Sequence, residues 1–210
     1  NVVLDIMIGT GKPVMVLAVL PMTAEDSLTK KNALETLSEL AKLVQAEKIQ
    51  NLIVIDNAKV ETIYSQASQM DFYDLANNAV TEPFDAFNLF SAQASKVKGL
   101  DPMELGRILT DGKGLTIFGQ MEVSEYDQDT SLAEAVIANL DNGLLASGFD
   151  LKQTRYAGVM FVSNSKVAKE IKALATDYAM SMVSEQTAGA MGVFKGVYVD
   201  DGMKEDIVKV

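Results

Sequence analysis

Two patterns of apolar residues follow one another in the first part of the chain. Val14–Leu20 and Leu52–Ile55 are continuous apolar runs, typical of parallel strands that are covered on both faces. Between them, after a Thr23-x-x-Asp26 segment that suits a helix start, apolar residues recur at helical spacing (Leu34, Leu37, Leu40, Ala41 and Val44). The pattern therefore predicts a strand, a helix and a strand joined as a right-handed crossover unit.

Further helices are expected on both sides of this unit. Asn1–Ile8 has the pattern of a helix end with Val2, Val3, Ile6 and Met7 on one buried face, so we expect the beginning of the protein to be missing. A short helix is expected at 60–64, and a long one from about Phe72 to Val97. In the long helix Leu75, Ala79, Ala86, Phe90 and Ala94 could share a face, and Pro83 is expected to kink or break it.

The second half of the chain alternates between strands and helices. A short helix at 102–110 precedes a strand at 115–121 and a helix that starts at a Ser131-x-x-Glu134 capping box, with Leu132, Val136, Leu140 and Leu144 inward. A strand at 157–162 precedes a helix with Val167, Ile171, Leu174, Tyr178 and Met182 on one face. Two strands, 192–199 and 206–210, close the chain through a turn in which Gly202 can take a positive φ. This order predicts a mixed sheet with helices on one face.

Composition and charge narrow the possible functions. The 210 residues are 48% hydrophobic, carry a net charge of -11, and include no Cys and no His. The charge disfavours direct contact with nucleic acid or an anionic membrane. Without Cys and His the chain cannot supply disulfides, Cys/His zinc sites or imidazole acid-base chemistry, so carboxylates, amides, hydroxyls, Lys and Arg must serve. No apolar stretch approaches the ~20 residues that span a bilayer, and we expect a soluble cytoplasmic protein.

The first candidate for chemistry is the loop after the strand at 14–20. Glu25 follows the carboxyl end of that strand, where open α/β sheets bind ligands, and its carboxylate could accept hydrogen bonds from ribose hydroxyls. The alternative is that Glu25 and Asp26 only favour the positive end of the following helix.

The second candidate combines Asn57, which follows the next strand, with Tyr73 and Asn77 on the long helix. A spacing of four puts Tyr73 and Asn77 on one helical face, so an aromatic plane and an amide could meet the same ligand, and this combination suits a purine base. Alternatively, Tyr73 is a half-buried core residue, Asn57 forms a turn and Asn77 is solvated.

The third candidate is the segment Gly99-Leu100-Asp101-Pro102-Met103-Glu104. Two carboxylates three positions apart at a helix start, Asp101 and Glu104, can hold and polarise a water molecule. The same order of Asp at N-cap, Pro at N1 and Glu at N3 is also a good helix start with no chemistry implied.

Taken in order, these segments resemble the tubulin and FtsZ superfamily of GTP-dependent filament proteins, over nearly the whole chain from Val14 to Val210. Glu25, after Val19-Leu20-Pro21, is similar to the family's acid that contacts ribose. Asn57 is similar to the Asn that reads the guanine edge. Both resemblances imply a guanine nucleotide at the carboxyl ends of the first two strands.

The same resemblance extends to the long helix and the loop after it. Tyr73 and Asn77 resemble the aromatic residue that stacks on guanine and the amide that bonds to it. Asp101 and Glu104 resemble the acids that enter the nucleotide pocket of the adjacent subunit and trigger hydrolysis there. No metal-binding residue is expected in this chain, although GTP or GDP with Mg²⁺ is implied for the intact protein.

The resemblance also implies a fold class and a domain organisation. We expect an α/β protein that corresponds to the C-terminal part of a tubulin/FtsZ-like fold. Residues 1–97 would be the remainder of the GTP-binding domain with a parallel sheet and the long central helix, and residues 98–210 an α+β activation domain with a mixed sheet. The family's glycine-rich phosphate loop would precede Asn1, so this chain alone is not expected to hold GTP tightly or to hydrolyse it.

The function implied is a filament-forming GTPase that assembles as a longitudinal homopolymer, for prokaryotic cell division or for plasmid or phage DNA positioning. Gly99 stands where the family usually has Asn, Thr29 where an arginine is expected, and Pro83 is atypical, which suggests a divergent branch of TubZ type. The same departures leave open a tubulin-like scaffold without hydrolysis. A metabolic α/β domain that binds a small ligand near Asn57 and Tyr73 is a third hypothesis.

Overall fold

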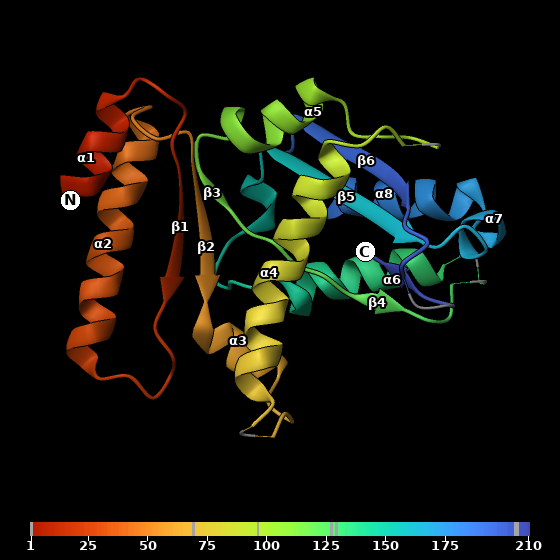
Figure 1. Cartoon of the computed structure of the whole chain (residues 1–210), viewed down its shortest axis with the longest axis horizontal. Coiled ribbons are helices and arrows are strands. Elements are labelled where there is room, and N and C mark those ends of the chain that lie inside the picture. Colours follow the sequence, from red (N-terminus) through yellow and green to blue (C-terminus); the bar gives the residue numbers. More distant parts are fainter. Residues whose placement is uncertain (1, 69, 96, 127, 129, 204–205) are drawn as a thin grey trace. The chain divides into compact units, whose positions relative to one another are not determined.

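A computed structural model (Figure 1) describes residues 2–68, 70–95, 97–126, 128, 130–203 and 206–210, so Asn1 and Lys96 of two predicted helices lie outside the described residues. The chain divides into two compact units. The first comprises Asn1–Val80, Leu109–Phe118 and Leu145–Ser147, and the second comprises Thr81–Ile108, Gly119–Leu144 and Gly148–Val210. The mixed α/β fold expected from the sequence is confirmed, and each unit has its own sheet.

The first unit contains a parallel sheet in the order β1-β2-β3, formed by Met15–Leu20, Asn51–Asp56 and Leu115–Thr116. Helix α2 (Ser27–Gln45) connects β1 to β2, which confirms the predicted strand, helix and strand. In β2, Leu52–Ile55 are buried without exception, as expected for a central strand covered on both faces.

Strand β1 differs from the prediction because only one of its faces is covered. Val16, Ala18 and Leu20 pack into the core beneath α2, whereas Met15, Leu17 and Val19 are each about half exposed. Within the described residues, β1 pairs with no strand other than β2, and so it forms the edge of the sheet. A continuous apolar run therefore does not by itself establish that both faces of a strand are buried.

The N-terminal helix α1 (Val2–Gly9) is confirmed, but its predicted buried face is wrong. Val2, Val3, Ile6 and Met7 are exposed, and the residues that pack against the core of the first unit are instead Leu4 and Ile8. The i, i+4 pair at 4 and 8 therefore defines the inward side of the helix.

Helix α2 starts three residues later than its predicted cap at Thr23. Asp26 is the N-cap residue, and its Oδ1 accepts from the backbone N–H groups of Leu28 and Thr29 at 2.8 and 2.9 Å. Leu37 and Leu40 pack inward as predicted, whereas Leu34 is exposed. Helical spacing alone therefore overestimated the width of the buried stripe.

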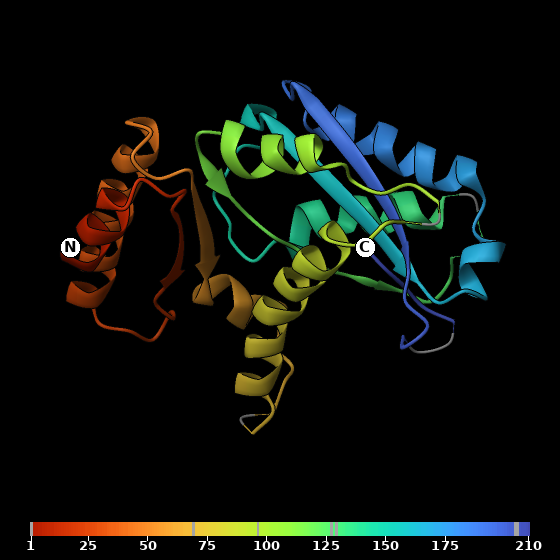
Figure 2. The same cartoon turned by 45° about the horizontal axis from the view of Figure 1, so that its top comes forward.

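Two helices follow β2: α3 (Asn57–Ile63), capped by Asp56, and α4 (Phe72–Ser91). Pro83 was predicted to kink or break α4, and it does not break the helix, which is continuous (Figure 2) and ends before Val97. Ala79 and, in the second unit, Ala86 and Phe90 pack inward as predicted, but Leu75 is exposed and Ala94 lies beyond the helix. The helix begins in the first unit and ends in the second.

The second unit has a mixed sheet in the order β4-β7-β5-β6, formed by Glu122–Val123, Val208–Lys209, Tyr156–Ser163 and Gly192–Val199. Strands β5 and β6 are parallel, and β7 is antiparallel to both of its neighbours. The strand predicted at 115–121 is wrong beyond its first residues: only β3 (Leu115–Thr116) falls within that range, and β4 (Glu122–Val123) follows it in the other sheet. The division falls at Gly119, where an added Cβ would lie 2.4 Å from Oδ1 of Asn139.

The helices of the second unit are α5 (Pro102–Gly106), α6 (Ser131–Ala138), α7 (Val167–Glu170) and α8 (Ala173–Gln186). Shorter turns are a π-helical turn at Arg107–Asp111, another at Asn139–Gly143 and a 3₁₀ turn at Leu151–Gln153. The capping box predicted at Ser131 is wrong, because Thr130 occupies the N-cap position and makes no side-chain cap bond. Leu144 lies beyond the helix predicted to contain it. None of the helices in the described part of the chain is long and apolar enough to span a bilayer.

The helix predicted from Val167 to Met182 is interrupted between α7 and α8. Because α8 begins afresh after Lys172, its inward side differs from the predicted one: Leu174 and Tyr178 are exposed, and Ala175, Ala179 and Val183 are buried.

The mixed sheet carries helices on both faces rather than on the one predicted. Phe161 points into a core with α6 and α8, whereas Val162 and Tyr198 pack on the other face against Phe90 of α4. Side chains that alternate between the two faces of β5 and β6 thus pack into two different cores. In the turn before β7, the positive φ predicted for Gly202 is found instead at Asp206, with φ 60°.

Candidate functional site

In the first unit, the carboxyl ends of β1 and β2 bring two of the predicted site residues to one edge of the sheet. The strands are parallel and end opposite each other, with Leu20 paired to Asp56, so the loop containing Glu25 and the start of α3 at Asn57 follow the same edge (Figure 1). Glu25 is exposed and Asn57 is half-buried. Asn57 is the first helical residue after the Asp56 cap rather than a turn former.

The loop between β1 and α2 is held by side chains that the sequence did not single out. The backbone N–H of Thr23 donates to Oε2 of Glu61 on α3 at 2.9 Å, and Nζ of Lys30 donates to the carbonyl oxygen of Thr23 at 2.5 Å. Hydrogen bonds from Thr23 lower the pKa of Glu61, and those from Thr29 lower the pKa of Asp26. Glu61 lies far from Thr23 in sequence, and no spacing pattern connects them.

Tyr73 and Asn77 lie on the first turns of α4, one helical turn apart, and both are exposed. The neighbouring residues Ala76, Ala79 and Val80 of the same turns pack against β2 and α3. Tyr73 is 63% exposed, and among the described aromatic contacts its ring meets only the ring of Phe72, edge to face, at a centroid distance of 5.6 Å. Tyr73 is therefore not the half-buried core residue of the alternative hypothesis, and its ring is accessible for stacking.

Together these four side chains have the chemistry to bind a nucleoside. The Glu25 carboxylate accepts from hydroxyls, the amides of Asn57 and Asn77 can donate and accept, and an exposed phenol offers a stacking surface. The described residues include no group of three carboxylates placed to hold a cation. The described residues of this unit thus include side chains whose chemistry suits a ribose and a base.

The acidic turn, residues Gly99–Glu104, is in the second unit. Its geometry shows the helix start that the sequence predicted: Oδ1 of Asp101 accepts from the N–H of Glu104 at 2.8 Å, and Oε2 of Glu104 accepts from the N–H of Asp101 at 3.0 Å. Asp101 is exposed and Glu104 half-exposed. Among the described residues no partner is recorded for Oδ2 of Asp101 or Oε1 of Glu104, so each carboxylate keeps an oxygen for another ligand.

The acidic turn is anchored to β6. The phenol oxygen of Tyr198 accepts from the N–H of Leu100 at 2.8 Å, and the N–H of Val197 donates to the carbonyl oxygen of Lys98 at 2.7 Å. Ser95 donates to the carbonyl oxygen of Val197. The ring of Tyr198 is buried against Phe90 with 5.1 Å between centroids. This role of Tyr198 could not be predicted from the sequence, because a tyrosine in an apolar strand is ordinarily a core residue.

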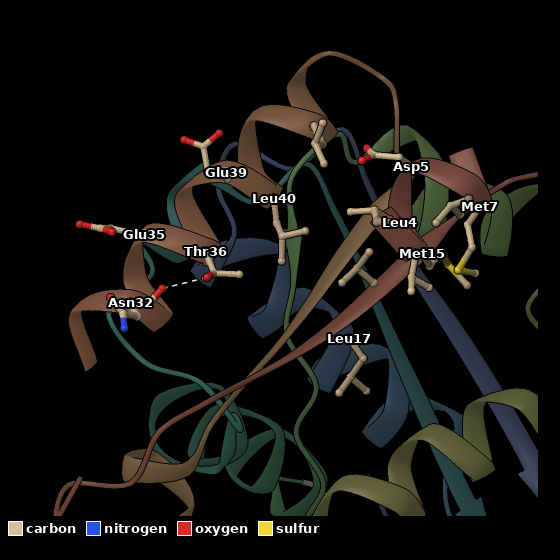
Figure 3. Close-up of a pocket in the computed structure, with 14 residues that line it drawn as sticks. Leu4, Asp5, Met7, Met15, Leu17, Asn32, Glu35, Thr36, Glu39 and Leu40 are labelled. Carbon is tan, nitrogen blue, oxygen red and sulfur yellow. Dashed lines mark hydrogen bonds between the residues drawn. The ribbon is translucent and has the colours of Figure 1, made fainter. Parts of the chain in front are cut away.

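A separate groove of about 940 Å³ lies between α1, the outer edge of β1 and α2 (Figure 3). Leu4, Met15, Leu17 and Leu40 form an apolar lining, and Glu35 and Glu39 of α2 stand at its rim. None of the predicted site residues lines it. The groove reflects the uncovered face of the edge strand and does not bring reactive side chains together.

Comparison with known proteins identifies the fold by structure and not by sequence. No known family and no curated protein matches the sequence. The structure matches a GTPγS-form protofilament of TubZ from Bacillus thuringiensis serovar israelensis (TM-score 0.81, 19% identity, 99% of this chain and 55% of that one).

Two other solved structures are similar. One is an FtsZ dimer from M. jannaschii (TM-score 0.76, 20% identity, 99% of this chain and 56% of that one), and the other is GDP-bound CetZ1 from Haloferax volcanii (TM-score 0.73, 19% identity, 99% and 57%). The chain spans a little over half the length of the structures it matches. Along that length, the chain has the fold of the tubulin/FtsZ superfamily.

Proposed function

We propose that the protein is a filament-forming GTPase of the tubulin/FtsZ superfamily that assembles from identical subunits in the cytoplasm of a prokaryotic cell. Its role would be in cell division or in plasmid or phage DNA positioning. The proposal is supported by the fold and by the form of the similar structures, which include a GTPγS-form protofilament of TubZ and a dimer of FtsZ.

In this proposal the first unit recognises the nucleoside part of GTP. Glu25 accepts from the ribose hydroxyls, Asn57 and Asn77 bond to the guanine edge, and the exposed ring of Tyr73 stacks on the base. Magnesium bound with the nucleotide would neutralise charge on the phosphates. Recognition by these residues is directed at the base and sugar, so it would be shared by GTP and GDP.

The acidic turn of the second unit acts on the nucleotide of the adjacent subunit. One carboxylate oxygen of Asp101 and one of Glu104 orient the water that attacks the γ-phosphorus. The bond from that phosphorus to the β–γ bridging oxygen then breaks, which gives GDP and inorganic phosphate. The observation that carries this assignment is the exposed capping box, which fixes both acids and leaves an oxygen of each without a recorded partner in the described part of the chain.

The test separates catalysis from capping. Asn is as good an N-cap as Asp, and Gln replaces Glu in a capping box, so Asp101→Asn and Glu104→Gln retain the helix start while removing each negative charge. In the protein expressed from its complete reading frame, we expect either variant to bind GTP and sediment as filaments, but to release phosphate about a hundredfold more slowly. Wild-type phosphate release by a variant above the assembly threshold would remove that acid from the mechanism.

One observation favours a second candidate, a tubulin-like scaffold that assembles without hydrolysis. Both acids already serve the start of α5, so the turn has a structural reason to contain them. A scaffold would show GTP-independent sedimentation and no phosphate release in the wild-type protein. Sedimentation with GTP compared with a slowly hydrolysed analogue distinguishes the two functions.

A further inference from the structure

The loop that contains Glu25 is held in place at Thr23, because both the N–H and the carbonyl oxygen of this residue are bonded to charged side chains. The N–H of Thr23 donates to Glu61 at 2.9 Å, and its carbonyl oxygen accepts from Lys30 at 2.5 Å. Both partners are half-buried, whereas Thr23 is exposed. A loop otherwise open to solvent is thus fixed at one residue by an anion and a cation.

The two fastening side chains come from the helices that flank the loop. Lys30 lies on the first turn of α2, just after the Asp26 cap, and Glu61 lies on α3. Glu61 is four residues after Asn57 on the same short helix, so one helical turn joins the two positions. The distance between Asn57 and the loop is therefore set by α3 and by the bond from Thr23 to Glu61.

The bond is suited to hold a loop in place. A hydrogen bond to a charged acceptor is stronger than one between neutral groups, and the Lys30 ammonium, which bonds to the other backbone group of Thr23, attracts the Glu61 carboxylate. A further turn bond runs from the N–H of Glu25 to the carbonyl oxygen of Met22 at 3.2 Å, and this carbonyl belongs to the same peptide unit as the N–H of Thr23. The position of Glu25 thus depends on Glu61 through that peptide unit, which bonds to the Glu61 side chain on one side and to the Glu25 N–H on the other.

We propose that Glu61 is a positioning residue, which holds the Glu25 carboxylate at the ribose of a guanine nucleotide while Asn57, on the same helix as Glu61, meets the base. This inference rests on the proposed function. It adds that Glu61, Thr23 and Lys30, although their bonds do not touch the nucleotide, contribute to preference for a nucleotide with ribose hydroxyls.

The experiment measures the affinity of the protein, expressed from its complete reading frame, for GDP and for 2′,3′-dideoxy-GDP by isothermal titration calorimetry. We expect Glu61→Ala to weaken GDP binding about fivefold and dideoxy-GDP binding by less than about twofold, because the lost contact acts only through the ribose hydroxyls. Glu61→Gln keeps an acceptor for Thr23 and should bind GDP within about twofold of wild type. Glu35→Ala, a matched control on the exposed side of α2, should change neither affinity.

A double-mutant cycle decides between positioning and a general loss of structure. In a Glu25→Ala background, Glu61→Ala should have no further effect on GDP affinity. Equal weakening of both nucleotides by Glu61→Ala, or additive effects of the two substitutions, would overturn the positioning role while leaving the proposed function intact. Unchanged GDP affinity in Glu25→Ala alone would instead overturn the ribose contact itself, and the positioning role with it.

Discussion

Tyr198→Phe removes a single hydroxyl and should reveal how strongly the acidic turn depends on β6. The phenol oxygen of Tyr198 is the acceptor that the structure gives to the N–H of Leu100, at 2.8 Å, and both residues are buried. The phenylalanine ring would keep its packing against Phe90, so no cavity is created. The change therefore isolates one buried hydrogen bond.

The loss of stability in Tyr198→Phe comes from the N–H of Leu100, which stays buried without its acceptor. A buried N–H that loses its acceptor destabilises a protein by about 1–3 kcal/mol, whereas removal of an exposed hydroxyl has an effect below about 0.5 kcal/mol. Leu100 directly precedes Asp101, so the same substitution should loosen the acidic turn and slow phosphate release. Tyr178→Phe on α8, at a residue that is 47% exposed, is the matched control for stability.

Urea denaturation followed by circular dichroism measures the loss as a lower midpoint with an unchanged m-value. A phosphate-release assay on the assembled protein measures the second effect. A destabilisation of Tyr198→Phe below about 0.5 kcal/mol, equal to that of the Tyr178 control, would refute the view that the Leu100 N–H depends on the phenol oxygen. A large loss of stability with unchanged hydrolysis would show that the anchor does not position the acids.

Three further predictions test packing and charge. Leu132→Ala, at a fully buried position of α6, should cost about 2–5 kcal/mol in urea denaturation, whereas Leu34→Ala on the exposed side of α2 should cost less than about 0.5. Gly196→Ala should cost about 1–3 kcal/mol because its Cβ would meet a buried tyrosine ring atom at 2.5 Å, whereas Gly106→Ala meets open space and should not destabilise. Hydrogen bonds hold the pKa of Glu61 below its ordinary value, so its contribution to stability is present above the ordinary glutamate pKa and is lost as pH falls through the lowered pKa. The difference in melting temperature between wild type and Glu61→Gln should therefore shrink over that acidic range. A difference that stays constant with pH would contradict the assignment.

Local signals predicted the elements well where one strong physical preference acted alone. Leu52–Ile55 had to be a buried strand, because a run of branched apolar side chains satisfies both faces of a central strand. The order Asp101, Pro102 and Glu104 predicted the start of α5, and both capping bonds are present. The same kind of reasoning failed at Ser131, where the capping box does not form.

Errors in the predicted core came from neighbours that periodicity does not include. The pattern of Met15, Leu17 and Val19 is the same as that of a covered strand, but β1 lies at the sheet edge. Leu174 and Tyr178 continue a regular spacing from Val167, and an interruption before α8 turns them outward. The exposure of a side chain depends on the elements that pack beside it, and the spacing of apolar residues within its own element does not predict those neighbours.

The candidate site shows the same division. The positions of Glu25 and Asn57 after parallel strands, and the spacing of Tyr73 and Asn77, were visible in the sequence because strand direction and helical pitch are local properties. The residue that holds the loop after β1 could not be predicted from the sequence: Glu61 accepts a hydrogen bond from the N–H of Thr23. These contacts join residues that are distant along the chain.

The sequence by itself determined the order and type of most elements, the absence of thiol and imidazole chemistry, and the placement of acids and amides at strand and helix ends. The tertiary structure alone decided that β1 is an edge strand, that the mixed sheet is covered on both faces, and that Tyr198 supports the acidic turn. The physical reason is range: backbone preference and periodicity act over a few residues, whereas burial and hydrogen-bond partners depend on segments that only folding brings together.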